Sequence, residues 1–429
     1  APTSAGKSFV ILLKAIQLIL DRGGNVIYVV PTLSLVAQVA ADFNRMFKRF
    51  GITQYDISTT YNLGEHKNER IYILTQEKAL SAFSQAQHPF QDIAALVIDE
   101  IQNMERVANE DDQRAKALYD ASIEFRDYCK PLITILSGPR VEGLKALGVE
   151  IFHEDAADEV KTKDSPVANL TYSISKVKNT YFFKQYSDLI AKPNSIPVTN
   201  SSWIQGFGKA QYSDDFISYL ASFIEKLGVD SRNIIFAPTS VQARSTAVEL
   251  ARLSSQKSED ERVQSLIKYV KDTVHTNYDL AEAIEKGFVY HHGKAPTHIR
   301  CVVENAIRER LVNNVVCTTT LMQGVNLPAQ NVIMRNPHLS IRSKEGVKPS
   351  LTDYEIANLR GRAGRLLKDF LGRTFVLEEN AFEKPTQTEL FQETEKTLAP
   401  GYSALYKTYE DEIIDALNDE TPLTQLPKE

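Results

Sequence analysis

The stretch IAALVIDE, residues 93–100, decides the fold class of this chain. Its first six residues are apolar on both faces of an extended strand, and an acidic pair ends it. Such a run is buried only where both faces of the strand are covered, as in a parallel sheet with helices on either side. The stretch therefore predicts a central strand of an α/β sheet.

Segments on both sides of this strand repeat the alternation of helix and strand. In the first part, helices are expected over 9–20 and 34–50, and strands over 25–30, 71–74, 93–98 and 132–136. The polar stretch 154–208 is typical of a linker and an irregular start to a second domain. Helices over 214–227 and 241–253 and strands over 233–236, 315–318, 331–334 and 373–378 follow. The expected fold class is α/β, with two tandem parallel-sheet domains over 1–160 and 161–383 and a short helical C-terminal extension over 384–429.

Composition is that of an ordinary globular protein, with 43% hydrophobic and 24% charged residues in 429. No apolar run reaches the ~18 residues that a membrane-spanning helix needs, so no membrane association is expected. Cys129, Cys301 and Cys317 have no disulfide or zinc-ligand spacing, which favours a reducing, cytoplasmic location. The net charge of −6 counts against a broadly basic surface, although a narrow groove needs only a local positive cluster.

The first eight residues, APTSAGKS, match a phosphate-binding loop except that Ala1 stands where the strict pattern has glycine. In such a loop, backbone N–H groups curl round a phosphate and the positive end of the following helix adds attraction. Lys7 is expected to reach the terminal phosphates, and the Ser8 hydroxyl to bind Mg²⁺. The chain begins inside this motif, so we expect it to be a fragment. The nucleotide-binding residues predicted here are Thr3, Ser4, Ala5, Gly6, Lys7 and Ser8.

The acidic pair Asp99-Glu100 supplies the second half of an ATP site. Asp99 is expected to hold Mg²⁺, and Glu100 to orient or deprotonate the attacking water. An acidic pair after a strand is also a common turn. Its position about ninety residues after a phosphate-binding loop, in an alternating α/β unit, favours catalysis.

Further motifs follow in a fixed order. PTLSL at 31–35, TQEK at 75–78, DEIQ at 99–102 and SGP at 137–139 correspond to helicase motifs Ia, Ib, II and III. FAPT at 236–239, TTTLMQGVNLPA at 318–329 and NLRGRAGR at 358–365 correspond to motifs IV, V and VI. With GFVYHHG at 287–293, they make the chain resemble, over about 1–380, the DExH helicases of the Ski-two-like type within superfamily 2.

This resemblance implies that both expected domains, 1–160 and 161–383, are RecA-like. It also implies roles for residues of the second domain. Arg362 and Arg365, three apart, are expected to act as arginine fingers on the γ-phosphate of ATP. Gly324 and Asn326 are expected near the nucleotide ribose. Single-stranded DNA or RNA is the implied partner, tracked in the 3′-to-5′ direction.

Contacts to the nucleic acid are expected at strand ends. Short hydroxyls there contact phosphates, which positions a strand without reading its sequence. The same threonines also suit simple helix caps. The residues assigned to this role are Pro31, Thr32, Thr75, Thr239 and Thr318.

Three departures from the family pattern leave other classes open. Gln102 stands where histidine is usual, Ser-Gly-Pro at 137–139 where Ser-Ala-Thr is usual, and Asn358 where glutamine is usual. Because the first two link hydrolysis to movement, a duplex translocase or remodeller, and a partner-dependent nucleic-acid-binding ATPase, are alternatives to a helicase. Further helicase domains or a nuclease partner, and a role in repair, RNA processing or phage defence, are consistent with the motifs. His291-His292 has no third ligand at suitable spacing, so packing is favoured over metal binding.

Overall fold

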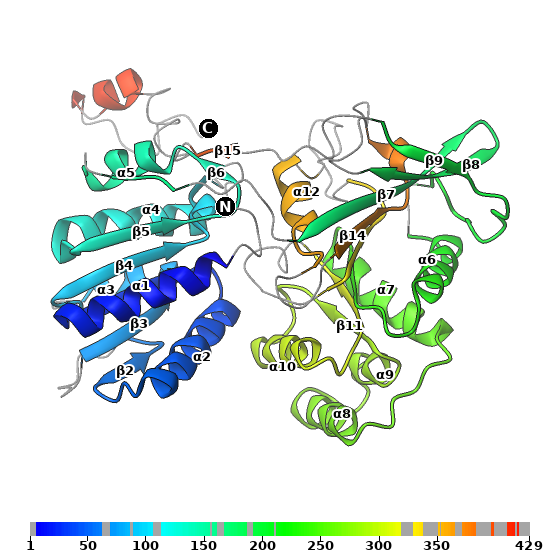
Figure 1. Ribbon diagram of the computed structural model, residues 1–429, viewed down its shortest axis with the longest axis horizontal. Coiled ribbons are helices and arrows are strands. Elements are labelled where there is room, and N and C mark those ends of the chain that lie inside the picture. Colours follow the sequence, from blue (N-terminus) through cyan, green and yellow to red (C-terminus); the bar gives the residue numbers. More distant parts are fainter. Residues whose placement is uncertain are drawn as a thin grey trace. The chain divides into compact units, whose positions relative to one another are not determined.

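The computed structural model describes most of the chain (Figure 1). The described residues are 6–61, 69–85, 89–105, 113–154, 157–160, 167–186, 192–209, 212–318, 329–337, 351, 353–364, 371–382, 396–398, 410–416 and 418–419. They divide into two compact units. The first comprises 8–161 with 396–429, and the second comprises 162–395 with 1–7.

The first unit is built on a parallel five-stranded sheet in the order β2-β3-β1-β4-β5. Its strands are β1 (Asn25–Val30), β2 (Tyr55–Ser58), β3 (Glu69–Thr75), β4 (Ile93–Asp99) and β5 (Ile133–Ser137). Its helices are α1 (Lys7–Arg22), α2 (Leu33–Phe50), α3 (Gln76–Phe83), α4 (Gln113–Glu124) and α5 (Leu144–Phe152), with short helical turns η1 (Ile101–Glu105) and η2 (Phe125–Cys129). The predicted strand over 25–30 is confirmed at both ends.

Alternate residues of each strand enter cores on opposite faces of this sheet. Val26, Tyr28 and Val30 of β1 pack with α1 and α2. Ile27 and Val29 pack with α3, α4 and α5 on the other face. Since both faces are covered by helices, the central strands have no polar face, which is why β4 is apolar throughout up to Asp99.

The second unit carries an eight-stranded sheet in the order β11-β12-β10-β13-β14-β7-β8-β9. Its strands are β7 (Ala168–Val177), β8 (Thr180–Tyr186), β9 (Asn194–Pro197), β10 (Asn233–Phe236), β11 (Phe288–His291), β12 (Asn314–Cys317), β13 (Asn331–Met334) and β14 (Leu371–Val376). Its helices are α6 (Asp214–Leu227), α7 (Ser240–Leu253), α8 (Glu261–Thr273), α9 (Leu280–Glu285), α10 (Thr297–Arg308) and α12 (Asp353–Arg360), with the turn η3 (Glu379–Ala381). The six strands from β11 to β7 are parallel. β8 pairs antiparallel with β7, and β9 pairs antiparallel with β8.

The expectation of a linker and irregular chain over 154–208 was wrong for three segments. β7, β8 and β9 extend the second sheet there, with β7 paired to β14 and the hairpin lying at the sheet's edge (Figure 1). The hydrophobic pattern did not predict β7 because three of its buried positions carry small polar residues, namely Thr171, Ser173 and Ser175. The Ser173 hydroxyl donates to Glu379, 3.0 Å away, so a polar core replaces the usual apolar alternation.

The end of the chain includes a strand as well as helix. β15 (Lys396–Thr397) pairs in parallel with β6 (Val141–Glu142), and Leu398 enters the core beneath α3, α4 and α5. Residues 410–416 are helical, as expected for the extension. The pairing of β15 therefore adds a contact to the first unit that the sequence did not predict.

Arg335 is the centre of a buried polar contact in the second unit. Its guanidinium donates to Glu378 at 3.0 Å, with the two side chains 1% and 3% exposed. It also donates to the Gly206 carbonyl at 3.2 Å and lies over the Phe216 ring, 4.1 Å from its centroid. The pair thus ties the ends of β13 and β14 to the loop before α6.

Among the described residues, no helix combines the length and apolar character needed to cross a bilayer.

Replacement of Arg335 by Met should lower the free energy of unfolding of the second unit by about 3–5 kcal/mol, because Glu378 stays buried without its partner. Urea denaturation followed by the fluorescence of Trp203 measures this unit, since the single tryptophan packs on Tyr219, 5.4 Å away.

The control is Arg252→Met, which removes an exposed arginine of α7 and should cost under about 0.5 kcal/mol. The double change Arg335→Met with Glu378→Leu should recover much of the loss. Equal effects of the Arg335 and Arg252 changes would contradict the assigned contact.

Candidate nucleotide and nucleic-acid site

Register in the first sheet brings the predicted motif residues to one edge. Val30 is opposite Thr75, and Asp99 is opposite Ser137. Because the strands are parallel, the segments that follow β1, β3, β4 and β5 all leave from the carboxyl edge. The residues of motifs Ia, Ib, II and III are therefore neighbours in space, although they are up to a hundred residues apart in sequence.

The described part of the phosphate-binding loop is Gly6-Lys7-Ser8. Gly6 has φ +79°, and an added Cβ would meet no atom within 4 Å, so open space adjoins the backbone here. Lys7 begins the 16-residue helix α1, and Ser8 is exposed in its first turn. Exposed N–H groups at a long helix start suit a phosphate, and the Ser8 hydroxyl suits Mg²⁺. Thr3, Ser4 and Ala5 lie outside the described residues.

Asp99 ends β4 as an almost buried carboxylate, 8% exposed. Its Oδ1 accepts from the Glu100 N–H at 3.1 Å, and its Oδ2 from the Tyr28 hydroxyl at 3.4 Å. Burial, and then the charge of Asp99, raise the pKa of Tyr28 well above its ordinary value, so this hydroxyl stays a donor. Two hydrogen bonds hold the carboxylate at the sheet edge, an arrangement that fits a magnesium ligand.

Glu100 sits in a strained turn directly after Asp99. Its φ of +59° is in the left-handed region, which residues with a side chain seldom adopt. The Asn103 side chain donates to the Glu100 carbonyl at 2.8 Å, and the Asn103 N–H donates to it at 3.0 Å. This turn directs the Glu100 side chain away from the helical path and is held by the start of η1.

Gln102 donates its side-chain amide to the Glu100 carboxylate. A Cβ at Gly138 would lie 2.8 Å from the Gln102 Oε1 and 3.0 Å from Val141. The two departures from the family pattern therefore fit each other. The Gln102 side chain fills the space that the Cβ of an alanine at position 138 would occupy. Within the described chain, the Gln102 Oε1 and the Ser137 hydroxyl are buried without hydrogen-bond partners.

Three of the four threonines assigned to nucleic-acid contacts are helix caps in this structure. The hydroxyls of Thr32, Thr75 and Thr239 accept from backbone N–H groups at 3.3, 3.4 and 3.2 Å and begin α2, α3 and α7. Thr318 follows β12, is buried, and its N–H donates to the His291 carbonyl at 3.3 Å. Capping uses one hydroxyl lone pair and leaves other N–H groups of each first turn open to a phosphate.

Arg114 is a site residue that the sequence did not indicate. Its guanidinium donates to the Pro31 carbonyl and pairs with Glu77 at 2.7 Å, and its own carbonyl accepts from Gln76 at 3.1 Å. It thus joins the segments of motifs Ia and Ib. Arg114 belongs to no motif and lies 37 residues after Glu77, so only the fold shows this contact.

In the second unit, Arg362 follows α12, and the next residue, Ala363, pairs with Ala329 just before β13. Burial raises the pKa of Cys317 to about 12, and the positive charge of Arg362 acts on it in the opposite direction. Gly364 has φ +76°, donates to the Ala329 carbonyl at 2.8 Å, and has no room for a Cβ, which would lie 2.9 Å from the Gly372 nitrogen. Gly324, Asn326 and Arg365 lie outside the described residues.

The two histidines of the GFVYHHG segment have separate packing partners. His291 Nε2 lies 2.8 Å from a Glu304 carboxylate oxygen, and both side chains are buried. His292 stacks on Tyr290 with ring centroids 5.5 Å apart. Burial, and then the neighbouring His291, lower the pKa of His292, which favours its neutral form.

Comparisons with known proteins agree with this arrangement. Residues 1–125 match the model of the DEAD/DEAH box helicase family. The chain is 24% identical over 393 residues to the ATP-dependent DNA helicase Hel308 of Methanocella arvoryzae, covering 88% of the chain and 48% of that protein. It is 26% identical over 390 residues to Hel308 of Thermoplasma acidophilum, covering 89% and 50%.

A plant protein is similar over the same length. The chain is 26% identical over 398 residues to the DExH-box ATP-dependent RNA helicase DExH13 of Arabidopsis thaliana, covering 88% of the chain and 17% of that protein. The chain spans about half the length of the two Hel308 proteins.

The chain thus combines two α/β units, with Asp99 at the carboxyl edge of the first sheet, and is similar over 88–89% of its length to named DNA and RNA helicases. These similarities agree with the resemblance to the superfamily 2 DExH helicases of the Ski-two-like group.

Gly138→Ala should displace the Gln102 side chain and break its hydrogen bond to Glu100, because the two groups cannot share the space. The change should lower the free energy of local opening of this segment by about 1–3 kcal/mol. Hydrogen–deuterium exchange of peptides over 93–105 measures it.

A double-mutant cycle with Gln102→Ala provides the control. With the Gln102 amide removed, the same glycine change should cost about 1 kcal/mol less. An identical cost in both backgrounds would show that the two positions are not coupled.

Proposed function

We propose that this chain is the motor core of an ATP-dependent nucleic-acid helicase or translocase, which couples ATP hydrolysis to 3′-to-5′ movement on single-stranded DNA or RNA. The observation that carries the proposal is the register that aligns Asp99 with Ser137 and Val30 with Thr75 at one sheet edge. An ATP site and strand-contacting segments on the same rigid edge provide the coupling that such a motor needs.

In this proposal, ATP is held by the loop from Thr3 to Ser8, with the Lys7 ammonium on the terminal phosphates. Ser8 and Asp99 hold Mg²⁺, which neutralises phosphate charge that develops during transfer. Glu100 accepts a proton from the attacking water, in the position that its left-handed turn defines. The hydrogen bonds from the Glu100 N–H and the Tyr28 hydroxyl orient the Asp99 carboxylate.

The second unit contributes positive charge and contacts to the ribose. Arg362 and Arg365 act on the γ-phosphate, and Gly324 and Asn326 approach the ribose, as the resemblance implies.

Pro31, Thr32, Thr75, Thr239 and Thr318 grip the strand through phosphates. Thr32, Thr75 and Thr239 stand at helix starts, where open N–H groups and the helix dipole favour an anion. DNA and RNA share this phosphate chemistry, and the relatives include a DNA helicase and an RNA helicase by name. A cytoplasmic location, with further helicase domains or a nuclease as partners, completes the proposal.

A second candidate function is a partner-dependent ATPase, or a duplex translocase, that does not separate strands. The bond from Gln102 to Glu100 favours it, since the amide occupies one carboxylate oxygen that the attacking water would use. A ligand that moves Gln102 would then control hydrolysis.

Steady-state ATP hydrolysis, measured with and without single-stranded DNA, single-stranded RNA and duplex, tests the proposal. Stimulation by one single strand is expected, and Glu100→Gln should lower the rate by about 10²-fold or more because a general base is lost. Glu124→Gln, at the other end of α4 from Arg114, is the control and should hydrolyse normally.

Strand displacement on a tailed duplex then separates the two candidates. Displacement supports a helicase, while stimulated hydrolysis without displacement supports the second candidate. Hydrolysis that survives Glu100→Gln would refute the assigned site.

Arg365→Ala and Arg362→Ala should each abolish turnover while nucleotide affinity stays within about tenfold, because the arginines act on the transition state. Fluorescent-nucleotide titration gives the affinity and phosphate release gives the turnover. Arg252→Ala, on the exposed face of α7, is the matched control. Turnover that survives the Arg365 change would exclude an arginine-finger role for it.

A further inference from the structure

A cavity of about 370 Å³ lies in the second unit, outside the site described above. Phe288 and Asn314, the first residues of β11 and β12, line it, which places it at the amino-terminal edge of the sheet. Thr239 and Thr318 follow the carboxyl ends of β10 and β12, at the opposite edge. The volume is within the range of about 300–1,000 Å³ that small-molecule sites occupy.

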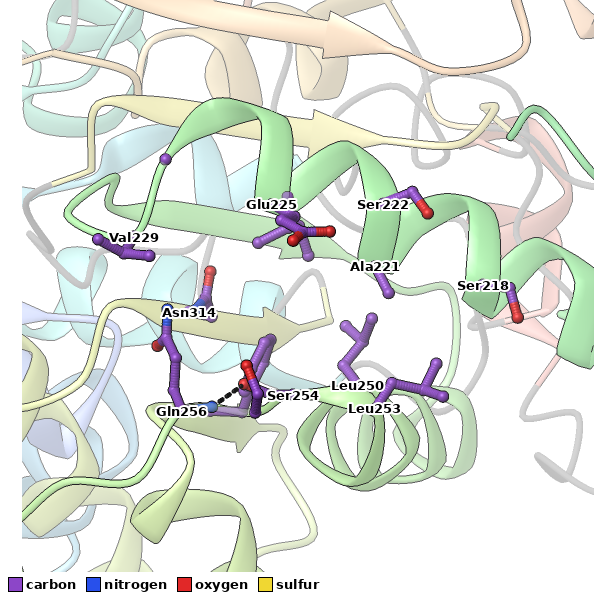
Figure 2. A pocket seen from close by; sticks show the side chains of 14 residues that line it. Ser218, Ala221, Ser222, Glu225, Val229, Leu250, Leu253, Ser254, Gln256 and Asn314 are labelled. Atoms are coloured by element: carbon purple, nitrogen blue, oxygen red, sulfur yellow. Dashed lines mark hydrogen bonds between the residues drawn. The ribbon is translucent and has the colours of Figure 1, made fainter. Parts of the chain in front are cut away.

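The cavity lies between α6 and α7 (Figure 2). The α6 wall carries Ser218, Ala221, Ser222 and Glu225, whose spacing of three, one and three puts them on one stripe of the helix. Three of the four side chains are small, so the helices leave a space that larger residues would fill. Across it, α7 presents Leu250 and Leu253.

Apolar and polar side chains both line the cavity. Leu250 and Leu253 lie at one end, below Ala221, Ser218 and Ser222 of α6. Val229, Asn314 and Gln256 lie toward the other end, with Glu225 above Asn314 and Gln256 (Figure 2). A ligand that satisfies both ends must itself carry an aliphatic part and one polar head.

The polar end is built from oriented groups. The buried Asn314 accepts at its Oδ1 from the Asn233 amide at 2.7 Å, and Asn233 accepts in turn from Asn331 at 2.7 Å. This ladder fixes the Asn314 carboxamide. The Ser254 hydroxyl accepts from the Gln256 N–H at 3.2 Å, so the turn after α7 is held as well.

Charge decides the nature of the head group. Glu225 is the one charged residue among those that line the cavity. Within the described chain its carboxylate forms no ion pair. A phosphate or carboxylate head would be repelled there, while an ammonium gains a partner.

Exposed apolar side chains stand beside the opening. Val229, after α6, is 64% exposed, and Leu253, at the end of α7, is 55% exposed. A hydrocarbon chain lying between them would remove apolar surface from water, at about 25 cal/mol per Å².

We propose that this cavity binds a linear aliphatic amine, with its ammonium group at Glu225 and its hydrocarbon chain along Ala221, Leu250 and Leu253. The same chemistry belongs to free polyamines and to the lysine side chain of a partner protein.

Calorimetric or ligand-observed NMR titration of the whole chain with n-heptylamine, n-heptanol and heptanoate tests the charge preference. Heptylamine should bind about fivefold more tightly than heptanol, and heptanoate about fivefold more weakly, because an exposed ion pair contributes up to about 1 kcal/mol. Equal binding of heptanoate and heptylamine would overturn the proposal.

Two variants locate the site. Glu225→Gln should remove the differences among the three compounds, whereas Glu249→Gln should keep them, because Glu249 already pairs with Arg252 at 2.9 Å and does not line the cavity. Ala221→Trp should fill the apolar end and abolish binding of all three, with circular dichroism confirming the fold. A preference that survives Glu225→Gln would refute the assignment.

Spermidine and the peptide acetyl-Leu-Lys-Leu-amide distinguish the two sources. Tighter binding of spermidine assigns the site to free polyamines, and tighter binding of the peptide assigns it to a lysine-bearing partner. Failure of both to bind would contradict the proposal.

Discussion

The parallel register of β1, β3, β4 and β5 is the constraint on which the candidate motor site depends. Backbone hydrogen bonds between these strands align Val30 with Thr75 and Asp99 with Ser137. Because β1, β3, β4 and β5 are parallel, the segments that follow them all begin at the carboxyl edge of the sheet. The consequence is local crowding of Pro31, Thr75 and the acidic pair, with Arg114 joining two of the segments. A register shift of one residue would turn Asp99 to the opposite face of the sheet.

Around that edge, local departures from regular structure are supported by neighbours. The left-handed Glu100 is held by Asn103, and Gln102 contacts Glu100 in the space that Gly138 leaves open. Strain of this kind persists only where surrounding contacts determine it. The unusual residues at 102 and 138 are therefore one feature of this chain rather than two separate losses. In this structure the side-chain amide of Gln102 donates to the Glu100 carboxylate, which is proposed as the general base.

The two edges of the second sheet differ in chemistry. Its amino-terminal edge carries the buried asparagine ladder and a cavity with one carboxylate, while Thr318 lies at the carboxyl edge. The Oδ1 atoms of Asn314 and Asn233 each accept a hydrogen bond in this ladder, which offsets the cost of burying them. One sheet can thus carry two functions, since rigid strands separate the groups that serve them.

The sequence by itself determined the α/β class, the strands over 25–30, 233–236 and 331–334, and the candidate residues of the motor motifs. These depend on local patterns, namely apolar runs, caps and short motifs that neighbouring residues encode. Only the tertiary structure decided the place of β7, because its buried serines and threonine give the sequence pattern of an exposed polar segment. It also decided the pairing of β15 with β6. It also decided the roles of Arg114 and Gly138 and the polarity of the α6–α7 cavity. The physical reason is that these features arise from contacts between residues far apart in the chain, which no local pattern records.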